Sequence, residues 1–234
     1  MDLLAIEVPS WVDVAAIGVG SLQGAMYAAQ FRDRQLDLLG VAMIGTATGL
    51  GGGFLRDILL QRPLIALSED WYLGTAVLFA LIGMLLARLI NKLDWAITVA
   101  DALTIGLFGA IGVAAALAQG LPPVPAIFVG TVSAVGGGVI RDILLNAPIA
   151  VMHVGSLYAV AALAGTLMFV ILRALGSSVD VSAVACVAVT AAIRILAVRF
   201  HWSLPEQRVI RGIRQPKLVR PADLTGPIDT PRDL

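Results

Sequence analysis

Two arginine–aspartate pairs lie inside apolar stretches of this chain. Arg56 and Asp57 follow the glycine triplet 51–53, and Arg141 and Asp142 follow the triplet 136–138. Within membrane spans, ionisable groups usually face a protein interior or an aqueous path. Each glycine costs a helix about 1 kcal/mol relative to alanine, so a triplet is a point where a helix can kink or unwind. The pattern predicts a polar path in which freed backbone carbonyls contact a cation.

The motif is duplicated. Segments 45–63 and 130–148 share eleven of nineteen residues at a constant offset of 85. A repeated costly feature indicates a duplicated functional element. Thr48 and Ser133 take equivalent places three residues before the triplets, where their hydroxyl groups extend the polar lining. The predicted ion-pathway residues are Thr48, Gly51, Gly52, Gly53, Arg56, Asp57, Ser133, Gly136, Gly137, Gly138, Arg141 and Asp142.

Each part of the motif has a simpler interpretation. Glycine triplets also let membrane helices pack closely. The charged pairs could lie near span ends and reach outward to the headgroups. We favour the broken-helix interpretation because an arginine–aspartate pair accompanies both triplets.

Composition places the chain in a membrane. Of its 234 residues 59% are hydrophobic and 14% are charged, whereas about a quarter of a soluble domain is charged. The net charge is zero, so no basic field favours nucleic acid. One cysteine and two histidines predict no metal cluster and no cofactor. No nucleophile–base arrangement stands out, and we expect no enzyme.

A membrane span needs about 20 apolar residues in a helix. Charges and prolines divide the chain into seven such candidates, and a polar, proline-rich tail follows them. We therefore expect an all-α domain over 1–203 and a flexible cytoplasmic tail over 204–234. The predicted spans are 12–31, 37–61, 71–90, 96–119, 125–148, 152–174 and 181–200.

The motif falls in the second span and again in the fifth. Three spans separate equivalent points, so the two copies must cross the membrane in opposite directions. The chain thus predicts an inverted repeat of about 12–90 and 96–174, with 181–200 as an added seventh span. Asp13 and Asp101 begin the two repeats at an offset of 88. They are second-tier candidates, either carboxylates at a pore mouth or complements to a helix N-terminal dipole.

The symmetric spacing suggests a pairing hypothesis. Neighbouring residues on a helix do not face each other. We therefore expect Arg56 to pair with Asp142, and Arg141 with Asp57, across the pseudo-twofold axis. Arg194, inside the seventh span, needs a carbonyl or carboxylate partner, or it must reach the headgroups.

Basic residues set the orientation of the spans. They gather at the ends of the first, third and seventh spans. We expect a multi-pass protein of the cytoplasmic (inner) membrane, with the N-terminus outside and the C-terminus in the cytoplasm.

The doubled GGG-x-x-R-D-x-L-L motif, in spans 2 and 5 of a seven-span chain, resembles the prokaryotic trimeric intracellular cation (TRIC) channels. Their sequence domain is also named for bacterial glycine transporters. The resemblance implies a homotrimer with a pore in each protomer between kinked spans 2 and 5. It implies passage of potassium and other monovalent cations. We expect membrane lipids as partners, and a bound lipid is possible. The alternative is a secondary transporter of glycine or another small zwitterion.

Overall fold

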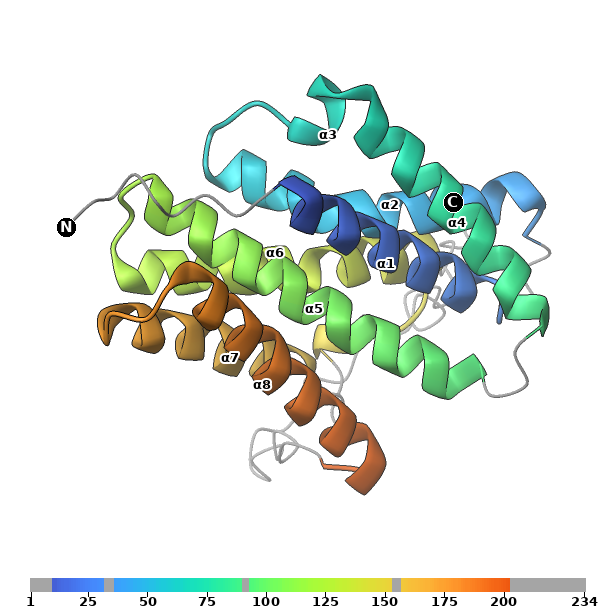
Figure 1. Cartoon of the computed structure of the whole chain (residues 1–234). Coiled ribbons are helices and arrows are strands. Elements are labelled where there is room, and N and C mark those ends of the chain that lie inside the picture. Colours follow the sequence, from blue (N-terminus) through green and yellow to red (C-terminus); the bar gives the residue numbers. More distant parts are fainter. Residues whose placement is uncertain (1–9, 32–35, 90–92, 153–156, 203–234) are drawn as a thin grey trace, which may run out of the picture. The chain divides into compact units, whose positions relative to one another are not determined.

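The computed structural model describes residues 10–31, 36–89, 93–152 and 157–202 of one compact unit, Met1–Leu204. In these ranges every regular element is helical (Figure 1). The tail predicted over 204–234 lies outside the described residues. The helices are α1 (Ser10–Ala28), α2 (Leu38–Leu59), α3 (Ile65–Ser68), α4 (Asp70–Leu89), α5 (Leu93–Ala118), α6 (Pro123–Leu144), the 3-10 helix η3 (Ala150–Met152), α7 (Tyr158–Ala174) and α8 (Val179–Phe200).

Each predicted span overlaps one of the long helices, although α7 begins at Tyr158, six residues after the start of the predicted span 152–174. Among the described residues, five helices are long and apolar enough to cross a membrane, namely α2, α4, α5, α6 and α8. α7 is apolar but has 17 residues. α1 carries Asp13, Ser21 and Gln23, which lower its hydropathy. The all-helical membrane fold is confirmed, whereas the number of seven spans stays a prediction.

The two repeats build matching sets of helices. α1, α2 and α4 pack on one another, and so do α5, α6 and α7. The sets meet where α2 contacts α6 and where α1 contacts α5, and Figure 1 shows α1 and α5 side by side. α8 packs on α5 and α7. The added helix therefore contacts the second repeat.

α2 and α6 end in the same way. Gln61 and Asn146, 85 residues apart, take left-handed backbone conformations with φ of 51° and 44°. The next residue in each copy then donates its N–H back to the carbonyl of Asp57 or Asp142, at 3.0 and 2.8 Å. This is the hydrogen-bond pattern that closes many helices at their C-terminus. It turns the chain so that α3 and η3 follow directly.

The glycine triplets lie at the closest approach of α2 and α6. A Cβ atom added to Gly137 would lie 2.2 Å from the Thr48 carbonyl oxygen, and one added to Gly52 would lie 2.4 Å from the Ser133 carbonyl oxygen. Numbers rise along α2 as they fall along α6, so the two helices are antiparallel. This is the order that an inverted repeat predicts.

The triplets do not unwind their helices. α2 and α6 run as continuous α-helices through residues 51–53 and 136–138. The carbonyl oxygen of Gly52 also accepts a hydrogen bond from the Ser133 hydroxyl, at 3.2 Å. The predicted unwinding is therefore wrong, because here glycine allows two helix backbones to touch while their internal hydrogen bonds remain. A kink at these residues stays a prediction.

The close approach makes Gly137 sensitive to added volume. We expect Gly137→Ala to lower the free energy of unfolding by about 1–3 kcal/mol, because the new methyl group would overlap the Thr48 carbonyl. SDS-induced unfolding in mixed micelles would measure the loss.

Gly74 is the matched control. It lies in α4 with no atom within 4 Å of an added Cβ. Gly74→Ala should leave stability unchanged or raise it by up to about 1 kcal/mol through helix propensity. Equal losses for the two variants would contradict the packing role of the triplet.

Candidate functional site

The first charged cluster gathers around Arg56, near the C-terminal end of α2. Its Nη1 donates to Asp13 Oδ1 of α1 at 2.8 Å, and its Nε donates to Asp57 Oδ1 at 2.8 Å. Arg62 Nε donates to the same Asp57 oxygen at 2.7 Å. Arg56 and Asp57 are each 2% exposed. We call these four residues the Arg56 cluster. Buried charges are tolerated only when they are paired and hydrogen-bonded, and both conditions are met here.

The second cluster repeats this plan on α6. Arg141 Nη2 contacts Asp142 Oδ1 at 2.7 Å, and its Nη1 lies 3.6 Å from Asp101 Oδ1 of α5. Arg194 Nε of α8 lies 3.4 Å from the other Asp101 oxygen. These four residues form the Arg141 cluster. The partner that the sequence required for Arg194 is therefore a carboxylate.

Aromatic rings complete the Arg141 cluster. The guanidinium of Arg141 lies over the Tyr27 ring, 4.0 Å from its centroid, and that of Arg194 lies 5.0 Å from the Tyr158 centroid. The Tyr158 hydroxyl donates to Asp101 at 3.0 Å. Cation–π contacts strengthen when the pair is removed from water. The rings thus hold the arginines on faces that the carboxylates leave open.

The aspartate of each motif also fixes the element that follows it. Asp57 Oδ2 accepts from the backbone N–H of Ile65 at 3.2 Å, and Asp142 Oδ2 accepts from that of Ala150 at 2.9 Å. These acceptors occupy equivalent positions in the two repeats. Each carboxylate therefore joins its arginine to the start of α3 or η3.

The cross-pairing hypothesis is wrong. Among the described residues, Arg56 makes no ion pair with Asp142, and Arg141 makes none with Asp57; each arginine binds aspartates of its own repeat. The argument from helix geometry failed because an arginine side chain is long enough to curl back to the carboxylate of the next residue.

Asp13 and Asp101 have a larger role than the sequence suggested. Both bind the arginine of their own repeat, so they are cluster members. Asp101 lies eight residues after the start of α5, which excludes it as a helix cap. Sequence reasoning gave Tyr158 no role. Tyr72 precedes it by 86 residues, nearly the spacing of the two aspartates, and this recurrence was the available signal.

The clusters lie on opposite sides of the α2–α6 crossing, which we call the waist. Each arginine is about six residues beyond the waist on an antiparallel helix, so the clusters are roughly 18 Å apart along the helix axes. A hydrocarbon core is about 30 Å thick, so both clusters fit within it. Their burial in protein, at 2–3% exposure for both arginines, argues against side chains that reach outward to the headgroups.

The hydroxyl residues of the motif lie at the waist. Thr48 Oγ1 donates to the Ile44 carbonyl at 2.7 Å, and the Ser133 hydroxyl donates to the Gly52 carbonyl. Thr48 is 2% exposed and Ser133 is fully buried. The predicted pathway residues are therefore brought together in one column of cluster, waist and cluster, and the waist is closed in this structure.

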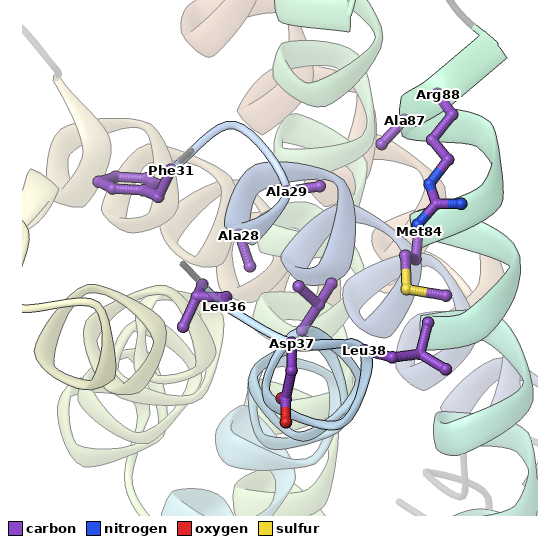
Figure 2. A pocket seen from close by; sticks show the side chains of 10 residues that line it. Ala28, Ala29, Phe31, Leu36, Asp37, Leu38, Met84, Ala87 and Arg88 are labelled. Carbon is purple, nitrogen blue, oxygen red and sulfur yellow. The ribbon is translucent and has the colours of Figure 1, made fainter. Parts of the chain in front are cut away.

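A cavity of about 430 Å³ lies apart from this column. It is lined by the end of α1, the start of α2 and the end of α4, and Figure 2 shows Asp37 and Arg88 among mostly apolar side chains. Asp37 accepts from the Gly40 N–H at 2.7 Å and so caps α2. None of the cluster residues lines the cavity. Within the described ranges no three His, Cys, Asp or Glu side chains gather as metal ligands.

The comparison with protein families identifies the family. A family model described as glycine transporter matches residues 10–88 and 98–174. The chain belongs to this family. The two matched stretches nearly coincide with the predicted repeats 12–90 and 96–174.

Individual proteins that are similar to this chain are membrane proteins. The UPF0126 membrane protein of Deinococcus radiodurans is 34% identical over 157 residues, which cover 66% of this chain and 72% of the relative. The UPF0126 inner membrane protein YadS of Escherichia coli is 29% identical over 198 residues, covering 83% and 94%. The chain is thus a membrane protein with several spanning helices.

The chain is also similar to solved structures of cation channels. A TRIC trimeric intracellular cation channel orthologue from Rhodobacter sphaeroides superposes with a TM-score of 0.75 at 27% identity, covering 82% of this chain and 98% of that one. The resemblance to prokaryotic TRIC channels is confirmed. This chain therefore has the fold of that cation channel.

The corrected pairing can be measured in double-mutant cycles. Arg56→Gln should cost about 3–5 kcal/mol of unfolding free energy, because it leaves the Asp13 carboxylate without a cation and leaves Asp57 with Arg62 alone. Combined with Asp13→Asn, it should show a coupling energy of about 1–3 kcal/mol. SDS titrations of the four proteins would supply the cycle.

Asp142→Asn provides the control cycle with Arg56→Gln. Its coupling energy should stay within about 0.5 kcal/mol, because the two residues belong to separate clusters. Strong coupling in the control and none with Asp13 would restore the cross-pairing hypothesis.

Proposed function

We propose that this protein is a homotrimeric, potassium-permeable channel with one pore in each protomer, running between α2 and α6. The observation that carries the proposal is the column of cluster, waist and cluster at this crossing. The trimeric cation channel of Rhodobacter sphaeroides, whose fold covers 82% of this chain, supports it. Membrane-buried ionisable residues that face the interior typically mark ion pathways.

The waist must widen for an ion to pass. In the closed arrangement a Cβ at Gly51 would lie 3.2 Å from the Gly137 Cα, which leaves no room for a cation between α2 and α6. A small separation or kink at the triplets would expose the carbonyls of Thr48 and Ser133 together with their hydroxyls. Such oxygens can replace part of a potassium ion's hydration shell.

In the proposed channel, one charged cluster lies on each side of the waist. Each holds two arginines and two aspartates, so its net formal charge is zero. An arginine beside the path repels a cation while it is free and repels it less while it is bound by two carboxylates. The ion pairs therefore tune the barrier and also hold the ends of α2 and α6.

The proposed topology has seven spans in the inner membrane, with the N-terminus outside and the C-terminus in the cytoplasm. The inner membrane location of the Escherichia coli relative supports the compartment. Lipids and monovalent cations would then be the partners of the protein, and it would need no cofactor.

The family description keeps a second function open. A secondary transporter of glycine would use the same two clusters, with an arginine for the solute's carboxylate and an aspartate for its ammonium group. The closed waist between two clusters suits such a carrier as well.

Planar-bilayer recording of the purified protein separates the two functions. For a channel we expect unitary potassium currents that reverse near the potassium equilibrium potential under a gradient and are absent when chloride is the only permeant ion. Glycine counterflow in proteoliposomes without unitary currents would support the transporter. The absence of currents in several lipid mixtures would refute the channel.

A further inference from the structure

The two halves of the column differ at one pair of equivalent positions. The offset of 88 that relates Asp13 to Asp101 also relates Gly20 on α1 to Phe108 on α5. Phe108 is 1% exposed, which makes it one of the largest fully buried side chains among the described residues. One half of the column therefore contains a phenyl ring where the other has only a hydrogen atom.

The Phe108 ring lies between the waist and the Arg56 cluster. A Cβ at Gly52 would be 3.2 Å from the ring's Cγ. A Cβ at Gly53 would be 4.0 Å from the ring's Cε1 and 3.9 Å from Nη2 of Arg56. The ring thus covers the first triplet on the side that faces Arg56. Its opposite edge faces α1, where a Cβ at Gly20 would be 3.6 Å from the ring's Cε2.

The α1 segment that follows Gly20 is polar instead. Ser21 and Gln23 of α1 are 0% and 1% exposed. Among the described residues, Ser21 Oγ and Gln23 Nε2 have no hydrogen-bond partner. Buried polar groups without partners are costly and call for an explanation. Water that enters an opened path would supply the missing partners.

We propose that Phe108 is a hydrophobic plug that separates the Arg56 cluster from the waist and controls ion entry from that side. The inference rests on the proposed channel function. An apolar constriction stops ions because it excludes the water that hydrates them. The plug is one-sided, because Gly20 carries no ring at the equivalent position and the ring beside the second triplet belongs to Tyr158, whose hydroxyl donates to Asp101. Opening requires the ring to leave Gly52, after which Ser21 and Gln23 become hydrated.

Bilayer recording tests the plug directly. Phe108→Ala should raise the potassium current per channel, as unitary conductance or open probability, several-fold over the wild type, and Phe108→Leu should give an intermediate increase. Phe169→Ala is the matched control, because Phe169 is also fully buried but lies on α7, in the core cluster that contains Val113 and Cys186. It should leave the current unchanged.

A labelling experiment tests the plug without requiring conduction. In a Cys186→Ser background, Ser21→Cys places a thiol on the side of the Phe108 ring that faces away from the Arg56 cluster. A charged, membrane-impermeant methanethiosulfonate reagent should modify this thiol several-fold faster when Phe108→Ala is added. Adding Phe169→Ala should leave the rate unchanged.

The outcomes separate the two claims. If the wild type conducts but neither Phe108→Ala nor Phe108→Leu changes the current or the labelling rate, the plug is overturned and the channel function is not. No current in any variant overturns the channel, and the labelling rates then decide whether the ring blocks a path. If Phe108→Ala does not fold, Phe108→Leu carries both measurements, and a wild-type current and labelling rate in that variant overturn the plug.

Discussion

The burial of two arginines, each held between two aspartates, is the constraint on which the rest of this structure depends. An unpaired charge at this depth would cost several kcal/mol, so every member of a cluster needs its partners. Arg56 ties the end of α2 to Asp13 on α1, and its partner Asp57 ties it to the start of α3. The positions of three elements thus follow from one guanidinium. The same logic in the second repeat orders α5, α6 and η3.

The glycine triplets provide the complementary constraint between the repeats. Because α2 and α6 touch backbone to backbone, the separation of the clusters is set by helix rise rather than by side-chain packing. Carbonyl oxygens meet glycine Cα atoms at the waist, and such contacts can part without breaking an ion pair. Strong interactions therefore lie at both ends of the column and weak ones at its centre, which places any opening at the waist.

The sequence predicted the fold better than it predicted the side-chain contacts. Repeat spacing and span parity are properties of the chain alone, and they led correctly to antiparallel α2 and α6. The pairing of Arg56 with Asp13 depends on which helix lies beside α2, and no local pattern encodes that neighbour. The triplets were misread because glycine favours both a broken helix and close packing; the position of the Thr48 carbonyl against Gly137 decides between them. Phe108 gave no signal, since an aromatic residue in an apolar span is ordinary.

The two clusters differ in the origin of their second arginine, and this has a consequence for biosynthesis. Every charge of the Arg56 cluster lies between residues 13 and 62, so the first repeat can neutralise itself as soon as its own helices insert. The Arg141 cluster receives Arg194 from α8. Until that last helix inserts, the second repeat holds two carboxylates and one guanidinium inside the bilayer. The added helix therefore completes the charge balance of the nascent protein, and truncation before residue 194 would leave a half-assembled chain with an excess negative charge in the membrane.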